Sequence, residues 1–381
     1  MPIEPFRVEV EEIVLVDLAR RLDRARLPNQ VEGAGWDQGT ELGYLESLLD
    51  HWRTAFDWRA QERWLNALPH FLTEVDGQRI HFLHVPSPEP GALPLLLSHG
   101  WPGSIVEFLD VIGPLTDPVA HGGDAADAFH VVAPSLPGYG FSGPTHEPGW
   151  NPRRMAGAFA GIMAELGYDR YGAQGGDWGS LVSANVADVD REHVCGLHLN
   201  FVVVPFPKDA DLSALTPEEQ AGLARMQEFR ATGVGYQEIQ GTKPQSLGYG
   251  LDDSPVGLAA WIVEKFRAWS DCDGDVERSF TKDQLLTNVM VYWVTRTATS
   301  STRLYYEMRQ AGRAALPESV EVPTGIARYP GEITRLPRAW IEARYPVTHW
   351  NELPRGGHFA AMEVPDLFVD DLRAFFRTVR G

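Results

Sequence analysis

The sequence predicts an α/β fold in which helices cover both faces of a mostly parallel β-sheet. Short apolar runs at 94–100 and 129–138 have the character of buried parallel strands. They alternate with segments such as 104–115 and 152–167, whose apolar residues recur every three or four positions, as on one face of a helix. This alternation is typical of a parallel sheet with a helix between successive strands.

Four regions follow along the chain. Residues 1–70 are expected to be helical and to pack on the core, because apolar residues recur at helical intervals in 14–28 and 42–68. A hairpin at 73–85, with an Asp-Gly turn, opens the first part of the core, 71–204. The alternation stops in 205–317, where helices dominate, and resumes in 318–381. We expect 205–317 to form a lid, with the ligand pocket between the lid and the sheet.

Composition excludes several classes of function. The net charge of -19 offers no basic surface for nucleic acid or for an anionic membrane, so a small uncharged ligand is the simpler partner. Two cysteines, with no Cys/His cluster, predict neither a disulfide framework nor a metal site. The acidic N-terminus lacks the pattern of a signal peptide, and no apolar run approaches the roughly 20 residues of a membrane span. We therefore expect a cytoplasmic protein.

The turn "GGDWG" at 175–179 lies between a predicted strand that leads into it and a predicted helix, 180–189. Its spacing is that of the G-x-S-x-G nucleophile elbow of α/β-hydrolases, with Asp177 in place of serine. An aspartate in such a turn can also be a simple helix cap. The order of later residues favours the nucleophile, since this fold continues with an acid after a later strand and a histidine near the C-terminus.

Glu332 and His358 occupy those two places. Glu332 follows the strand predicted at 320–330, and His358 follows the one at 347–353. Glu363 or Asp190 could in principle orient the histidine instead.

The motif "HGWP" at 99–102 ends a strand where α/β-hydrolases keep an oxyanion-binding amide. The expected donors are the backbone N–H groups of Trp101 and Trp178. A cis Trp101–Pro102 bond would be one way to aim the first of them inward.

Seven stretches of the sequence, spread over nearly the whole chain, together resemble epoxide hydrolases of the microsomal and juvenile-hormone type. They are "FDWRAQERWLNALPHF", "LLLSHGWPGSIVEF", "VVAPSLPGYGFS", "GGDWGS", "GYQEIQGTKPQSLGYGLDDSPVGLAAWIVEKF", "PTGIARYPGEI" and "RGGHFAAME". The resemblance implies that Asp177 is the nucleophile, Glu332 the acid and His358 the base. It also implies that Tyr236 and Tyr306 hold the epoxide oxygen. Tyr305 is adjacent to Tyr306, and the two would point about 100° apart on a helix.

Animal members carry a membrane anchor ahead of the helical N-terminal region, and this sequence starts without one, as expected of a soluble bacterial member. Members of the family are often dimers, so a homodimer is a further expectation from the resemblance.

The chemistry of the residues agrees with the resemblance. An aspartate carboxylate is ionised at neutral pH, so it needs no base to attack a saturated carbon. The leaving oxygen of an epoxide stays tethered and can be protonated by a tyrosine. Water activated by His358 would then hydrolyse the ester on Asp177 to give a vicinal diol, without a metal or an organic cofactor.

Trp101, Trp178, Phe141 and Gln237 are expected at the substrate pocket, and the aromatic content favours an apolar or aryl epoxide. A role in secondary metabolism and a role in epoxide degradation both stay open. Two other functions compete. A haloalkane dehalogenase also uses an aspartate nucleophile but needs no pair of lid tyrosines. An α/β-hydrolase that only binds a ligand would have no reason to keep the aspartate, the histidine, the glutamate and both tyrosines.

Overall fold

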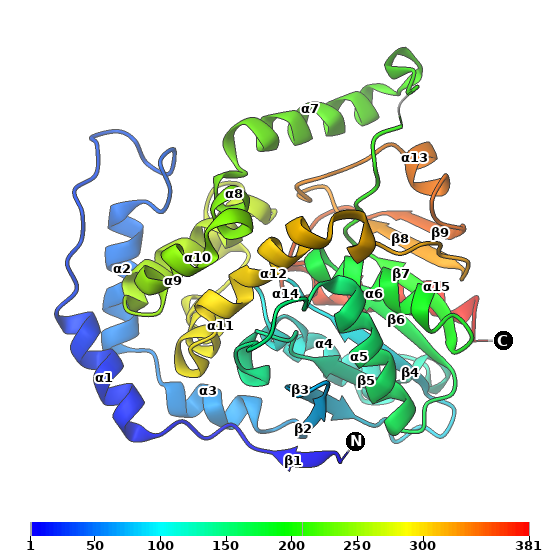
Figure 1. The fold of residues 1–381 in the computed structure, drawn as a ribbon, viewed down its shortest axis with the longest axis horizontal. Coiled ribbons are helices and arrows are strands. Elements are labelled where there is room, and N and C mark those ends of the chain that lie inside the picture. The colour runs from blue at the N-terminus through cyan, green and yellow to red at the C-terminus, as the bar shows by residue number, and fades with distance from the viewer. Residues whose placement is uncertain (1, 208, 381) are drawn as a thin grey trace.

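The computed structural model describes residues 2–207 and 209–380 and contains, within them, one nine-stranded sheet (Figure 1). The strands lie in the order β1-β2-β3-β5-β4-β6-β7-β8-β9. The six strands from β5 to β9 are parallel to one another, whereas β1, β2 and β3 pair in antiparallel fashion. The strands are β1 Glu4–Phe6, β2 His70–Val75, β3 Gln78–Val85, β4 Leu93–Ser98, β5 Phe129–Pro134, β6 Tyr171–Gly175, β7 Val194–Leu199, β8 Thr324–Arg328 and β9 Val347–Glu352.

The central strands are buried on both faces, which explains their continuous apolar runs. Leu95, Leu96 and Leu97 of β4 are fully buried although successive side chains point to opposite faces of the sheet. Strand β6 has the same character, since all five of its residues are buried. The parallel strands predicted from the sequence are therefore present, and β6 leads directly to the turn that carries Asp177.

Helices cover the sheet on its two sides. A Cβ on Gly172 of β6 would meet Phe376 of α15, whereas a Cβ on Gly175 would meet the backbone of α6. Residues three apart on a strand face opposite sides, so α15 and α6 lie on opposite faces. Helix α4 lies beside α15, and α5 lies beside α6. These helices and two short ones near the C-terminus are α4 Leu109–Thr116, α5 Pro152–Glu165, α6 Asp177–Val189, α13 Arg338–Glu342, α14 Ala360–Glu363 and α15 Pro365–Arg377.

The N-terminal region differs from the prediction in one respect. It holds three helices, α1 Glu12–Asp23, α2 Leu42–Thr54 and α3 Trp58–Leu65, but it begins with strand β1. Strand β1 pairs with β2 at the edge of the sheet, so residues 1–70 are not wholly helical. A strand of three residues is too short to show an alternating pattern, and its pairing depends on an edge that only the folded sheet provides.

Every element between β7 and β8 is helical (Figure 1). Helix α12 lies against α8 and α9, and α10 lies against α11 and α9, so these segments form one layer. Helix α7 leads into this layer and extends above β8 and β9 in the view of Figure 1. The helices are α7 Pro217–Thr232, α8 Gly235–Thr242, α9 Pro244–Leu251, α10 Pro255–Trp269, α11 Lys282–Thr295 and α12 Ala298–Ala311.

None of the helices in residues 2–207 and 209–380 combines the length and the apolar character that crossing a bilayer requires.

Candidate active site

The turn between β6 and α6 holds Asp177 in a strained conformation. Its φ angle is 49°, in the left-handed region that costs a residue other than glycine about 1–3 kcal/mol. Two glycines make the turn possible. A Cβ on Gly175 would lie 2.1 Å from the carbonyl oxygen of Gly179, and a Cβ on Gly179 would lie 1.9 Å from that of Ser98 in β4. This close approach of α6 to strands β4 and β6 leaves the Asp177 side chain free to project from the end of β6.

The Asp177 carboxylate has one contact from each side of the site. The backbone N–H of Trp101 donates a 2.8 Å hydrogen bond to Asp177 Oδ1. On the other side, His358 Nε2 lies 3.3 Å from Asp177 Oδ2. The Trp101–Pro102 peptide bond is cis. The motif after β4 thus brings a backbone donor to the carboxylate, as expected from the sequence.

His358 is oriented by Glu332. The loop after β9 carries His358, the segment after β8 carries Glu332, and His358 Nδ1 lies 2.8 Å from Glu332 Oε1. The backbone N–H of His358 donates to the carbonyl oxygen of Trp269 at 2.9 Å, which ties this loop to α10. Both carboxyl and imidazole side chains are buried.

The two alternative acids have other partners. Glu363 accepts hydrogen bonds from the backbone N–H groups of Asp271 and Phe359, at 2.8 and 2.9 Å. Asp190 contacts Tyr171 and His193, both at 2.6 Å. Neither contacts His358, so Glu332 is the acid that the fold brings to the histidine.

The electrostatics of the site favour a protonated histidine while Asp177 is ionised. Burial by itself lowers the pKa of His358, but the Glu332 and Asp177 carboxylates outweigh it and raise that pKa well above its usual value. Removing the charge of either carboxylate would lower the pKa again. The protonation state of His358 is therefore coupled to the charge of Asp177.

Two tyrosines from the helical layer face this carboxylate. Tyr236 of α8 stacks on Trp101, with ring centroids 5.2 Å apart and planes 10° apart. Tyr305 of α12 lies 5.7 Å from Tyr236, and its ring meets Trp178 edge-on at 4.8 Å. The two phenols are hydrogen-bonded to each other, and Gln237 Nε2 donates to the Tyr236 hydroxyl at 2.9 Å. Burial and the nearby Asp177 charge raise the pKa of Tyr236, which keeps the phenol protonated.

The expected position of Tyr306 is wrong. Its side chain is 38% exposed, compared with 8% for Tyr305, and it lines a surface groove with Lys243 and Pro244. The adjacent positions on α12 point about 100° apart, so only one of them can face Asp177. The residue type was predicted correctly, but the phase of the helix is set by its contacts with α8 and α9.

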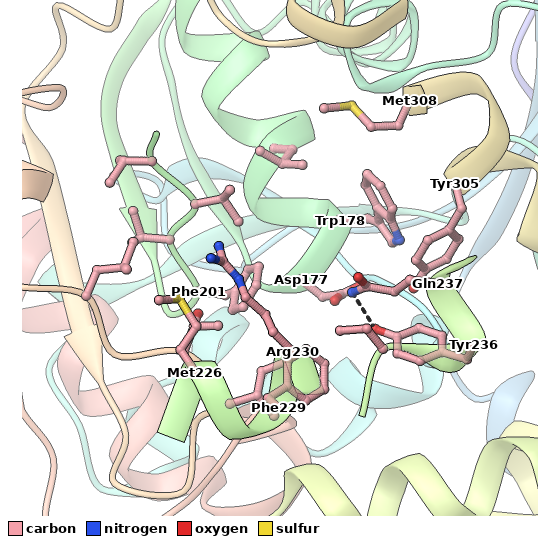
Figure 2. A pocket seen from close by; sticks show the side chains of 18 of the residues that line it. Asp177, Trp178, Phe201, Met226, Phe229, Arg230, Tyr236, Gln237, Tyr305 and Met308 are labelled. Atoms are coloured by element: carbon pink, nitrogen blue, oxygen red, sulfur yellow. Dashed lines mark hydrogen bonds between the residues drawn. The ribbon is translucent and has the colours of Figure 1, made fainter. Parts of the chain in front are cut away.

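The cavity above Asp177 has a volume of about 300 Å³, and Figure 2 shows its lining. Trp178, Gln237 and Tyr236 line it, as expected, whereas Trp101 and Phe141 do not. Phe141 is buried elsewhere, 5.7 Å from Phe6 and near two histidines of the antiparallel strands, because its 3-10 turn packs under β3. The lining residues are Asp177, Trp178, Leu181, Phe201, Val202, Val203, Val204, Phe206, Met226, Phe229, Arg230, Val234, Tyr236, Gln237, Tyr305, Met308, Ile333, Thr334 and Leu336.

Glu107 is a further carboxyl group beside the site that sequence reasoning missed. Its side chain occupies the space left by Gly103, where an added Cβ would lie 1.6 Å from Glu107 Oε1, and it is hydrogen-bonded to the backbone of Gly100. Burial raises the pKa of Glu107 to about 8, with opposing effects from His358 and Asp177. In the sequence, Glu107 reads as a solvent-facing helix residue, and no pattern signals that it turns inward.

No cluster of three or more His, Cys, Asp or Glu side chains suited to a metal ion occurs within residues 2–207 and 209–380.

A strained aspartate turn after a parallel strand, facing a histidine held by an acid from a later strand, is the arrangement of an α/β-hydrolase. Comparison with known proteins agrees. Residues 94–232 match the family model of the alpha/beta hydrolase fold, and residues 3–108 match that of the epoxide hydrolase N terminus.

Relatives narrow the class. A chain from Stigmatella aurantiaca is 48% identical over 380 residues, covering 100% of this chain and 86% of its own length. Epoxide hydrolase 1 of Sus scrofa is 41% identical over 400 residues, covering 98% of this chain and 88% of its own. The crystal structure of juvenile hormone epoxide hydrolase from Bombyx mori superposes with a TM-score of 0.91 at 32% identity, covering 100% of this chain and 95% of that one. The chain therefore belongs to the epoxide hydrolase family.

Proposed function

We propose that this hydrolase opens an apolar epoxide through a covalent ester on Asp177. Asp177 Oδ2 attacks one epoxide carbon, the carbon–oxygen bond breaks, and the alkoxide takes a proton from Tyr236 or Tyr305. The phenolate formed regains a proton through water, which carries the proton that His358 releases once the charge of Asp177 is lost. The observation that carries the proposal is the pair of contacts on one carboxylate, a 2.8 Å bond from the Trp101 amide to Oδ1 and a histidine 3.3 Å from Oδ2.

The second step hydrolyses the ester. His358, oriented by Glu332, removes a proton from water, and the hydroxide adds to the carbonyl carbon of the ester. The oxyanion forms on Oδ1, which the Trp101 amide already contacts, with the Trp178 amide as the second expected donor. Such a donor contributes roughly 2.7–4 kcal/mol in other enzymes. Collapse of the intermediate releases the diol, whose leaving oxygen takes the proton from His358. The Asp177 carboxylic acid that remains then gives its proton to the histidine, which restores the carboxylate and the protonated imidazole.

Ester formation itself prepares the histidine for this step. Asp177 loses its negative charge when it is alkylated, and that charge is one of the causes that raise the pKa of His358. The pKa of His358 then falls, so the imidazole becomes neutral and can act as a base. The same charge therefore holds a proton on the histidine before the first step and releases it for the second.

The lining of the cavity supports an apolar substrate, aryl epoxides included, because valine, phenylalanine, methionine and leucine side chains dominate it. Its physiological setting would be bacterial, in secondary metabolism or in epoxide degradation, and we further propose a cytoplasmic protein able to form a homodimer. Size-exclusion chromatography with light scattering tests the dimer.

Isotope labelling tests the covalent route. With enzyme in excess over styrene oxide in oxygen-18 water, the diol from the first turnover should contain no label, because its new oxygen comes from Asp177. The label should instead appear in the peptide that contains Asp177. Label in the diol of that first turnover contradicts the covalent route and favours direct attack by water.

Two variants separate the steps. His358→Gln should accumulate enzyme whose mass is increased by that of the substrate, since the ester forms but is not hydrolysed. Asp177→Ala should show no such increase, and its thermal unfolding serves as the control for folding. An equal adduct on both variants would contradict the role of Asp177.

A further inference from the structure

The cavity contains one cation among apolar side chains. Arg230, near the end of α7, is one of two charged residues that line the cavity within the described parts of the chain, the other being Asp177. Figure 2 shows its side chain extending among the lining residues, with the guanidinium drawn beside Phe201. In a cavity of this apolar character, a single charged side chain is a group that can fix the orientation of a ligand.

The guanidinium of Arg230 has no anionic partner in residues 2–207 and 209–380. Its central carbon lies 5.2 Å from the centroid of the Phe206 ring, a contact that leaves its N–H donors free. Neighbouring arginines are paired in contrast. Arg335 contacts Glu218 and Glu352, and Arg225 donates to the carbonyl oxygen of Pro330 at 2.8 Å.

The chain as a whole does not favour anions, with a net charge of -19. Long-range repulsion is nevertheless screened over about 8 Å at physiological ionic strength, so a local cation determines what the cavity can bind. A guanidinium presents its donors in a planar fork that matches a carboxylate. Because Arg230 is solvent-exposed, a ligand would displace water from it and not an existing ion pair.

We propose that Arg230 binds a carboxylate at the end of the substrate remote from the epoxide, which makes the preferred substrate an apolar epoxide that carries an acid group. This inference rests on the proposed function of Asp177. The apolar lining binds the hydrocarbon, Asp177 and the tyrosines receive the epoxide, and Arg230 fixes the other end. The length of the hydrocarbon must then match the separation of the two polar ends.

The test uses terminal epoxy acids of six, eight, ten and twelve carbons, each paired with its methyl ester. For the wild type, KM for the acid should be about tenfold lower than for the ester at one chain length, with similar kcat. Arg230→Gln should abolish this difference by raising KM for the acid alone, and 0.5 M sodium chloride should have the same effect on the wild type. Arg230→Lys should restore part of it.

Arg225→Gln is the matched control, because it removes a cation from the same helix outside the cavity lining. It should leave the ratio of the acid and ester KM values unchanged. Turnover of the esters by Arg230→Gln shows that this variant is folded. Equal KM values for acid and ester in the wild type, or an equal rise for both in Arg230→Gln, overturns the carboxylate site. Failure of the proposed function would give a different result from failure of the carboxylate site. In that case neither the acids nor their methyl esters would form diol through a covalent intermediate on Asp177.

Discussion

Replacing Tyr305 by phenylalanine removes one buried hydroxyl from the cavity and leaves the ring against Trp178 in place. The neighbouring change, Tyr306→Phe, removes a hydroxyl from a residue that is 38% exposed. The two variants lose the same atom from adjacent positions. They differ in whether that atom faces Asp177, so they test the assignment of the second tyrosine directly.

The magnitude follows from the contacts of the hydroxyl. A hydrogen bond to a charged group contributes about 1.5–3 kcal/mol, and the alkoxide carries charge only as the ring opens. Losing it should slow ester formation by roughly 10- to 150-fold. The Tyr305 hydroxyl also bonds to that of Tyr236, whose remaining partner is Gln237. A surface change such as Tyr306→Phe should stay within about 0.5 kcal/mol, or roughly twofold.

The assay is the single-turnover rate of ester formation with excess enzyme. The reaction is quenched in acid, and the mass of the intact protein is measured by mass spectrometry. The His358→Gln background prevents hydrolysis and lets the ester accumulate. Thermal unfolding of both variants controls for general damage. A tenfold loss in Tyr306→Phe with normal rates in Tyr305→Phe would reverse the assignment. Normal rates in both would refute a role for a second tyrosine and leave Tyr236 as the proton donor.

Three further predictions concern protons and packing. Burial lowers the pKa of His358, and its carboxylate neighbours raise it. Because the ester removes the charge of Asp177, the rate of ester hydrolysis should increase with pH around a midpoint lower than the pKa of His358 in the free enzyme. Quenched-flow rates give the midpoint, and NMR titration gives the pKa of the free enzyme. Equal midpoints would contradict the coupling. Burial raises the pKa of Glu107 to about 8, so Glu107→Gln should remove any component of the pH–rate profile centred there and change kcat at pH 6 by no more than about twofold. Gly179→Ala places a Cβ 1.9 Å from a carbonyl oxygen of β4 and should lose about 3 kcal/mol or more in urea unfolding, whereas Gly157→Ala, with nothing within 4 Å, should gain up to about 1 kcal/mol.

Much of the fold follows from patterns that are local in the sequence. The apolar runs of β4 and β6 and the helical periodicity of α5 and α6 are properties of short segments, and they place Asp177 at a turn before any contact is known. The order of Asp177, Glu332 and His358 along the chain then predicted that these side chains meet, because parallel strands bring their carboxyl ends to one edge of the sheet. Strand β1 escaped this reasoning because it is only three residues long.

The errors share a physical cause. Tyr305 and Tyr306 are chemically equivalent neighbours, and the rotation of α12 against α8 and α9 decides which of them faces Asp177. Phe141 follows a motif near the site, yet its ring packs beside Phe6. Glu107 was given no role from the sequence, because it turns inward only where the missing side chain of Gly103 leaves space for it.

The sequence by itself determined the class of fold, the proposed nucleophile and the order of the candidate catalytic residues, because each depends on residue type and on spacing along one segment. Tertiary structure decided which tyrosine faces Asp177, that Glu332 and not Glu363 orients His358, and that Arg230 lies in an apolar cavity. These features depend on side chains from segments far apart in the chain. Their relative rotation and distance are set by packing between layers, which no single segment encodes.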